Sequence, residues 1–214
     1  MVVDAPQRSP EWFQARAGRV TASCAKHIGA FLKGGDDSAA RRDYKMQLVC
    51  ERLTGFPDED GYTNDDMARG IALEPQALSA YEAQTGSLVG RVGFLSHTDL
   101  MAGGSPDGVI GDFEGLVECK APRPANHVRY LRQGGIPKEH EAQLRHLLWL
   151  TGAAWIDFVS FCPLMPNDLK LYVERMKADE VTLKRHDGDV RAFLDEVQLE
   201  YDSLRGWSVL SEAK

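Results

Sequence analysis

The fold and function of this chain are constrained most strongly by two short segments. Each places charged residues next to apolar ones. Gly-Ser-Pro-Asp-Gly at residues 104–108 leads into an apolar pair, and Leu-Val-Glu-Cys-Lys follows at residues 116–120. Proline and glycine mark the first segment as a turn, so Asp107 lies where a loop enters a strand. Residues two apart in a strand share a face, so Glu118 and Lys120 point to the same side. The sequence therefore predicts an Asp, a Glu and a Lys at one edge of a sheet.

These residue types suit hydrolysis assisted by a hard divalent cation. The carboxylates of Asp107 and Glu118 are the oxygen ligands that Mg²⁺ prefers, and the main-chain carbonyl of Cys119 is a further ligand. Lys120 can orient the attacking water or help to deprotonate it. The same triplet also occurs in ordinary hairpins, where the Asp is a turn residue and the Glu and Lys form a solvated strand face. The triplet alone leaves both interpretations open.

The N-terminal region contains a second candidate site. Ser9 is placed as the N-cap of a helix that contains Trp12, and a second helix is expected to begin at residues 21–23. Arg16 and Arg19 flank the break between these helices, where free backbone N–H groups and guanidinium forks together favour phosphate binding. A pair of exposed arginines beside a core tryptophan is the structural alternative, and the spacing does not choose between them.

Several of these motifs resemble those of the phage lambda exonuclease and YqaJ-type viral recombinase family, a branch of the PD-(D/E)xK nucleases. The resemblance extends from about Trp12 to the strand near Phe161. It rests on motifs that arrive in the family's order: Trp12, Arg16-x-Gly18, Thr21-Ala22-Ser23, Glu74, Ser105-Pro106-Asp107-Gly108, Glu118-Cys119-Lys120 and Gln143. An ordered series of this kind argues against the interpretation of the triplet as an ordinary hairpin.

The resemblance implies a restriction-endonuclease-like α/β fold, with a mixed central sheet of about five strands flanked by helices. We expect one nuclease domain over residues 1–214. Its N-terminal helices, within residues 9–55, would form the site for the DNA 5′ end, and residues 66–175 would form the catalytic core. A C-terminal amphipathic helix is expected over residues 189–205.

The resemblance also implies roles for single residues. Glu74 would support the nucleophilic water together with the catalytic lysine, and Gln143 would help to place it. Arg16 and Ser23 would hold the terminal 5′-phosphate, and Trp12 would stack on or wedge against the terminal nucleotide. These assignments come from the matching positions and not from spacing.

The implied activity is Mg²⁺-dependent degradation of one strand of duplex DNA from its 5′ end, which leaves a 3′ single-stranded tail for recombination. Mn²⁺ is expected to substitute, with two ions in each site. The resemblance further implies a homotrimeric ring around DNA and a single-strand annealing recombinase as partner. Polarity, ring and partner are not readable from the residues themselves.

Composition is compatible with this interpretation. The net charge is −7, but the first 50 residues carry +3, and whole-chain charge is a poor guide to a local DNA contact. The four cysteines are widely spaced, which favours neither a zinc site nor a disulfide framework. Residues 1–30 lack the apolar segment of a signal peptide, and no apolar run is long enough to span a bilayer. We therefore expect a cytoplasmic protein, and the resemblance implies a bacterial host cell and a phage or prophage origin.

Three basic residues open a predicted helix that ends near residues 54–55. Arg41, Arg42 and Lys45 either contact the DNA backbone or form a solvated helix face. A further helix is expected over residues 66–85, and Pro75, beside the candidate Glu, should kink or restart it.

Strands are expected over residues 88–96, 101–103 and 116–120, together forming an antiparallel meander. An apolar strand over residues 154–161 should be central, and one over residues 170–175 should lie at an edge.

Two alternatives remain at this level. The chain could be an endonuclease of the same fold that cuts internally or at branched structures, or a DNA-end-binding module without catalysis. The loop over residues 33–42 departs from the family pattern, which leaves the element at the DNA entrance undefined. The loop over residues 56–64 is a candidate rim or subunit contact.

Overall fold

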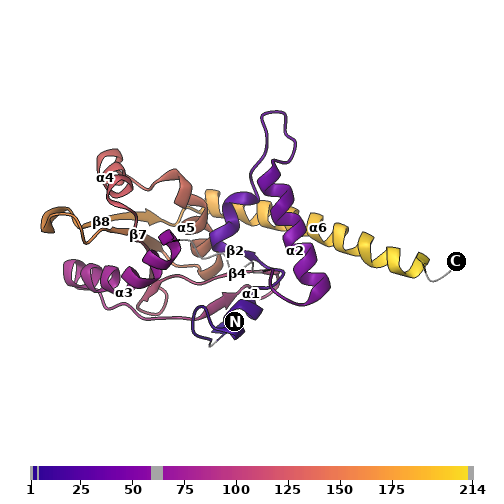
Figure 1. Ribbon diagram of the computed structural model, residues 1–214, viewed down its shortest axis with the longest axis horizontal. Helices are drawn as coiled ribbons and strands as arrows, with labels where there is room; N and C mark the ends of the chain where they lie inside the picture. Colours follow the sequence, from indigo (N-terminus) through magenta and orange to yellow (C-terminus); the bar gives the residue numbers. More distant parts are fainter. Residues whose placement is uncertain (1, 4, 59–64, 212–214) are drawn as a thin grey trace.

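The computed structural model describes residues 2–3, 5–58 and 65–211. Their strands form two four-stranded sheets, in the orders β1-β3-β4-β2 and β5-β6-β7-β8 (Figure 1). The mixed α/β class is as predicted, but the single sheet of about five strands and the continuous meander are wrong. The break falls between β4 (Ala102–Gly104) and β5 (Gly108–Ile110), where Pro106 has no N–H to donate to a ladder. The chain changes sheets at this turn.

The second sheet contains the strand that carries Glu118 and Lys120. Its strands are β5, β6 (Gly115–Lys120), β7 (Trp155–Phe161) and β8 (Leu171–Lys177). β6 and β7 are parallel, whereas the other two pairs are antiparallel. The expected central strand and edge strand are therefore confirmed. A parallel pair needs a crossover, and α4 (Pro124–Gln133) and α5 (Lys138–Thr151) provide it.

Helices cover both faces of this sheet (Figure 1). α3 (Asp65–Thr85) packs on the face that carries Val117 and Cys119, and α5 packs on the face that carries Leu116. The buried hydrophobic residues of the two helices are Ala77, Leu78 and Tyr81 on α3 and Leu144, Leu147 and Leu148 on α5. This alternation confirms that odd and even residues of β6 face opposite sides. α3 is one continuous helix, so it does not restart at Pro75.

The first sheet is built from short strands: β1 (Val2–Val3), β2 (Val20–Thr21), β3 (Phe94–Ser96) and β4. The strand expected over residues 88–96 is shorter than predicted, and Gly90 forms only an isolated bridge with Val109. α1 (Pro10–Arg16) begins as expected, with Ser9 Oγ accepting a hydrogen bond from the Trp12 amide. The next helix, η1 (Ala22–His27), is a 3₁₀ helix of six residues.

Arg41 on α2 (Ala39–Thr54) has a structural role that neither expectation included, whereas Arg42 is exposed, as expected for a solvated helix face. Arg41 is 3% exposed and donates to the Ile28 carbonyl, to Asp37 and, through two nitrogens, to Glu196. Its guanidinium also lies over the rings of Phe31 and Phe193. Arg41 therefore joins the 28–38 loop and α2 to α6 (Glu180–Ser211) and faces neither DNA nor solvent.

α6 is much longer than the helix expected over residues 189–205 and extends beyond the body of the molecule at its C-terminal end (Figure 1). In the ranges that the structure describes, no helix is long and apolar enough to cross a membrane. Residues 59–64 of the expected 56–64 loop lie outside the described residues.

We predict that Arg41→Gln lowers the free energy of unfolding by about 2 kcal/mol or more, because it removes charge-assisted hydrogen bonds and leaves polar partners unsatisfied. Denaturant unfolding measures the change. Arg42→Gln is the matched control, since Arg42 is the exposed neighbour, and its change should stay within about 0.5 kcal/mol. Equal effects of the two substitutions would contradict the buried role of Arg41.

Candidate active site

The turn between the two sheets places Asp107 against the catalytic strand. Asp107 Oδ2 accepts a hydrogen bond from the Cys119 amide at 2.7 Å. Gly108 makes the close approach possible, because a Cβ at this position would lie 2.2 Å from Val89 Cγ1. The turn residues predicted from the sequence thus bring the Asp carboxylate to the carboxyl end of β6.

Glu118 lies at the centre of the site, with only 2% of its surface exposed. Its two carboxylate oxygens have different surroundings. Oε1 accepts hydrogen bonds from Lys120 Nζ and from Gln143 Nε2, both at 2.6 Å. Oε2 is buried and has no hydrogen-bond partner. A buried carboxylate oxygen without a donor is costly unless a cation or water satisfies it.

The electrostatics of the site also indicate a shortage of positive charge. Desolvation and the neighbouring charge of Glu118 raise the pKa of Asp107 well above its usual range. Burial alone would lower the pKa of Lys120, but the charges of Glu118 and Asp107 outweigh it and the pKa rises. Lys120 is therefore a charged donor in this arrangement, which suits orienting a water better than deprotonating one. Burial likewise raises the pKa of the Cys119 thiol, which stays protonated.

The donor set fits a hard cation. Among the described residues, no three His, Cys, Asp or Glu side chains gather into a metal site. The candidate ligands are all oxygen atoms. Two belong to side chains, the Asp107 carboxylate and Glu118 Oε2, and the third is the main-chain carbonyl of Cys119. Mg²⁺ commonly uses one or two carboxylates and keeps several waters, so two side chains suffice.

Glu74 reaches the site from α3 and is held by two arginines that the sequence analysis missed. Arg8 Nη2 donates to Oε2 at 3.1 Å, and Arg91 Nη1 donates to Oε1. Arg91 Nη1 also donates to the Asp107 carbonyl at 3.1 Å. Both arginines lie outside any periodic pattern and far from Glu74 in the chain, so no local sequence signal identifies them.

The second predicted site forms around the end of α1. Trp12 Nε1 donates to Ser105 Oγ at 2.9 Å, and the Arg16 guanidinium lies 4.2 Å from the centroid of the Trp12 ring. Arg16 Nη2 also reaches Ser23 Oγ at 3.5 Å. Trp12, Arg16 and Ser23 are therefore brought together, and Ser105 joins them to the catalytic turn.

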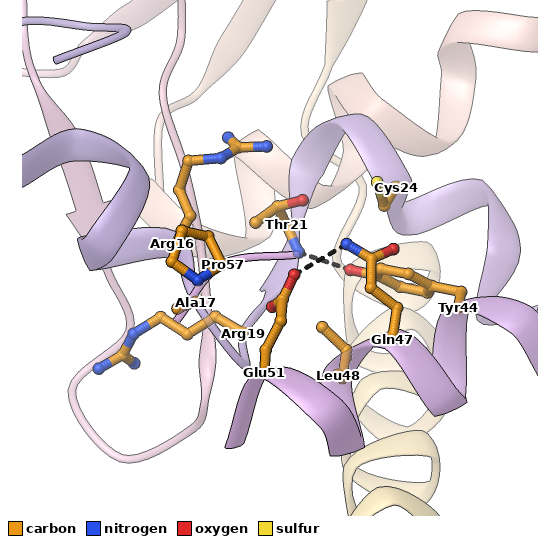
Figure 2. A pocket seen from close by; sticks show the side chains of 10 residues that line it. All are labelled: Arg16, Ala17, Arg19, Thr21, Cys24, Tyr44, Gln47, Leu48, Glu51 and Pro57. Carbon is orange, nitrogen blue, oxygen red and sulfur yellow. Dashed lines mark hydrogen bonds between the residues drawn. The ribbon is translucent and has the colours of Figure 1, made fainter. Parts of the chain in front are cut away.

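Arg19 does not join this cluster. It donates to the Leu100 carbonyl, and Figure 2 shows its guanidinium pointing away from that of Arg16. A cavity of about 50 Å³ lies beside both residues, with Tyr44, Gln47 and Glu51 of α2 on its other side (Figure 2).

Glu51 fixes the backbone turn between the two arginines. It accepts a hydrogen bond from the Gly18 amide at 2.6 Å. Gly18 has φ +68°, and a Cβ there would lie 2.7 Å from Arg52 Cγ, so the glycine of the Arg-x-Gly motif is required by the backbone.

A family model of the YqaJ-like viral recombinase domain matches residues 11–154, which include every candidate site residue named from the sequence. The chain belongs to this family. The exonucleases of this family are generally metal-dependent, which agrees with the oxygen donor set described above. No curated protein sequence matches the chain at a significant level.

Solved structures agree with the family assignment. An alkaline exonuclease from Laribacter hongkongensis, LHK-Exo, is 34% identical, with a TM-score of 0.85 over 94% of this chain and 98% of that chain. The same values apply to LHK-Exo in complex with dAMP. A phage-related exonuclease from Haemophilus somnus shares the fold at 15% identity, with a TM-score of 0.65 over 92% of this chain and 96% of that chain. The YqaJ-like chain is thus a nuclease of the lambda exonuclease type with a restriction-endonuclease-like fold.

We predict that Asp107→Asn stabilises the protein in EDTA at pH 8. The pKa of Asp107 is higher in the folded state than in the unfolded state, so folding stability falls as the pH rises from about 3.9 through the raised pKa. Asn removes this pH-dependent cost and can still accept the hydrogen bond from the Cys119 amide. Thermal unfolding should therefore give a higher Tm for the variant at pH 8 and a smaller difference near pH 4.

Added Mg²⁺ should reverse the order, because a ligand that binds the folded state raises its stability. The Tm of the wild-type protein should rise with Mg²⁺ concentration, and the Tm of the Asp107→Asn variant should rise less. Equal Mg²⁺ responses of the two proteins would count against Asp107 as a ligand.

Proposed function

We propose that this nuclease is a Mg²⁺-dependent exonuclease that degrades one strand of duplex DNA from its 5′ end and leaves a 3′ single-stranded tail. Mn²⁺ would substitute, with two ions in each site. The product of each step would be a 5′-mononucleotide. The complex of the similar LHK-Exo with dAMP, a deoxynucleoside monophosphate, supports this product class.

One observation carries the proposal: the hydrogen bond between Trp12 Nε1 and Ser105 Oγ. It joins the Arg16 and Ser23 cluster directly to the turn that carries Asp107. A terminal 5′-phosphate held by Arg16 and Ser23 would then lie on the same wall as the carboxylates, so the first phosphodiester bonds of that strand would come close to them. Holding the end and the reacting bond on one rigid unit is the arrangement that an end-dependent nuclease needs.

The chain's own residues have distinct tasks in this scheme. Asp107, Glu118 Oε2 and the Cys119 carbonyl would hold the cation, which when bound supplies charge neutralisation on the phosphate and activation of water. Lys120, as an ammonium, would orient the attacking water, and Gln143 keeps Glu118 in place by its hydrogen bond to Oε1. Glu74 would accept a hydrogen bond from the same water. Trp12 would stack on the terminal nucleotide.

The family resemblance extends the proposal to assembly. A homotrimeric ring would keep the enzyme on its DNA between steps, and a single-strand annealing recombinase would take up the 3′ tail. The enzyme would act in the cytoplasm of a bacterial host cell, where its duplex DNA substrate is found. Sedimentation and cross-linking with DNA measure the oligomeric state independently of activity.

The proposal predicts that a linear duplex with a 5′-phosphate loses its 5′ strand in Mg²⁺ but not in EDTA. A duplex with a 5′-hydroxyl should be degraded at least tenfold more slowly, because it lacks the charged group that Arg16 would bind. Strand-specific end labels on a gel give both rates.

Two variants make this assay specific. Arg16→Gln should remove most of the preference for the 5′-phosphate, whereas Arg19→Gln, the matched control, should leave the preference in place because Arg19 points away from the cluster. Asp107→Ala should abolish cleavage. Cutting of a covalently closed circle would instead indicate an endonuclease, and end binding without cleavage would indicate a binding module.

We also predict that Lys120→Gln lowers kcat by about 100-fold or more while Kd for a duplex end, measured in EDTA, changes little. A group that acts mainly on the attacking water affects the transition state more than ground-state binding. A large loss of end binding with unchanged kcat would assign Lys120 to DNA binding instead.

A further inference from the structure

A cavity of about 400 Å³ opens beside Glu74 and has no role in the function proposed above. Its walls are residues 5–8, the middle of α3 and residues 91–93. Ile71, Pro75 and Val92 give it an apolar side, and Arg8 and Arg91 give it a cationic one. A volume and lining of this kind suit a small ligand with one apolar part and one anionic group.

The two arginines hold opposite oxygens of a single carboxylate. Arg8 donates to Glu74 Oε2 and Arg91 to Glu74 Oε1. The Glu74 side chain is only 11% exposed, whereas those of Arg8 and Arg91 are 43% and 50% exposed. The guanidinium groups thus cover the carboxylate and present their outer sides to the cavity. Two cations share the single Glu74 carboxylate, so each guanidinium keeps N–H groups that can bind a second anion from the cavity.

The position of Arg8 is not explained by fold stability alone. Its φ of +71° lies in the left-handed region, which a non-glycine residue adopts at a cost larger than an exposed ion pair contributes. The preceding residue, Gln7, donates to the Pro106 carbonyl at 3.2 Å, so this segment is fastened to the catalytic turn. Strain of this kind, held in place by the surroundings, is characteristic of functional sites.

We infer that Arg8 and Arg91 form a second phosphate-binding subsite, which takes the phosphate group of a nucleotide. This inference rests on the proposed DNA hydrolysis. The phosphate belongs either to the released 5′-mononucleotide or to the backbone of the bound strand, and the bidentate fork of arginine suits both. Arg91 also contacts the Asp107 carbonyl, so the subsite adjoins the catalytic turn. A phosphate that draws the arginines away leaves Glu74 able to accept a hydrogen bond from the attacking water.

The test uses metal-free protein in EDTA, so that binding is measured without turnover. Calorimetry measures binding of dAMP and of deoxyadenosine, which lacks the phosphate. Fluorescence anisotropy measures binding of a labelled linear duplex over a range of salt concentrations. The variants are Arg8→Gln and Arg91→Gln, and the matched control is Arg129→Gln, because Arg129 is 55% exposed and pairs with one carboxylate, Glu139, elsewhere. Both measurements are repeated with Arg16→Gln, which removes the other phosphate site.

If the subsite takes the product, Arg8→Gln and Arg91→Gln weaken dAMP binding by about tenfold or more, Arg129→Gln has no effect, and deoxyadenosine binds weakly to all of the proteins. If it takes the strand, dAMP binding is unchanged, duplex binding weakens, and the slope of log K against log salt concentration falls by about 0.9 for each lost contact. A purely structural role would not change that slope. Arg91→Lys, which keeps the charge, should recover part of the lost binding.

Unchanged binding of both dAMP and duplex in Arg8→Gln and Arg91→Gln would overturn the inference. Its failure is distinguishable from failure of the proposed function. The latter would appear as intact 5′ strands after wild-type protein is incubated with a linear duplex and Mg²⁺, an assay that involves neither variant.

Discussion

The unequal surroundings of the two Glu118 oxygens are the constraint on which the rest of the site depends. One oxygen is saturated by Lys120 and Gln143, and the other is buried without a donor. Desolvation and repulsion at the nearby Asp107 act in the same direction, since both make the ionised carboxylates costly without more positive charge. The protein therefore maintains an electron-rich edge whose oxygen donors fit a cation. Such sites lower stability in exchange for function, as many active sites do.

The fold explains how the two candidate sites come to lie together. The chain changes sheets at the turn over residues 105–107, between β4 and β5. Ser105 at the start of this turn contacts Trp12 of α1, and Asp107 at its end contacts the Cys119 amide of β6. The two sites are thus joined through three consecutive residues. Loss of the turn geometry would separate the two candidate sites even if each stayed intact.

The sequence predicts the structure correctly where neighbouring residues alone determine it. Alternation along β6, the cap at Ser9 and the Pro-Asp-Gly turn are all set by neighbouring residues, and each is found in the structure. The sequence does not predict the role of a residue whose interaction partner comes from a distant element. Arg41 reads as a surface residue of an amphipathic helix, and only the approach of Glu196 from α6 buries its guanidinium. The sequence does not identify Arg8 and Arg91 for the same reason, because Glu74 contacts both only in the folded chain.

The central claim is that Asp107, Glu118 and the Cys119 carbonyl form a divalent-cation site, and anomalous diffraction from crystals grown with Mn²⁺ tests it most directly. The account predicts an anomalous peak bonded to the Asp107 carboxylate, to Glu118 Oε2 and to the Cys119 carbonyl oxygen. Lys120 and Gln143 should remain on Glu118 Oε1. No peak at this position in crystals of a preparation that is active with Mn²⁺, or a peak bound through other residues, would contradict the account.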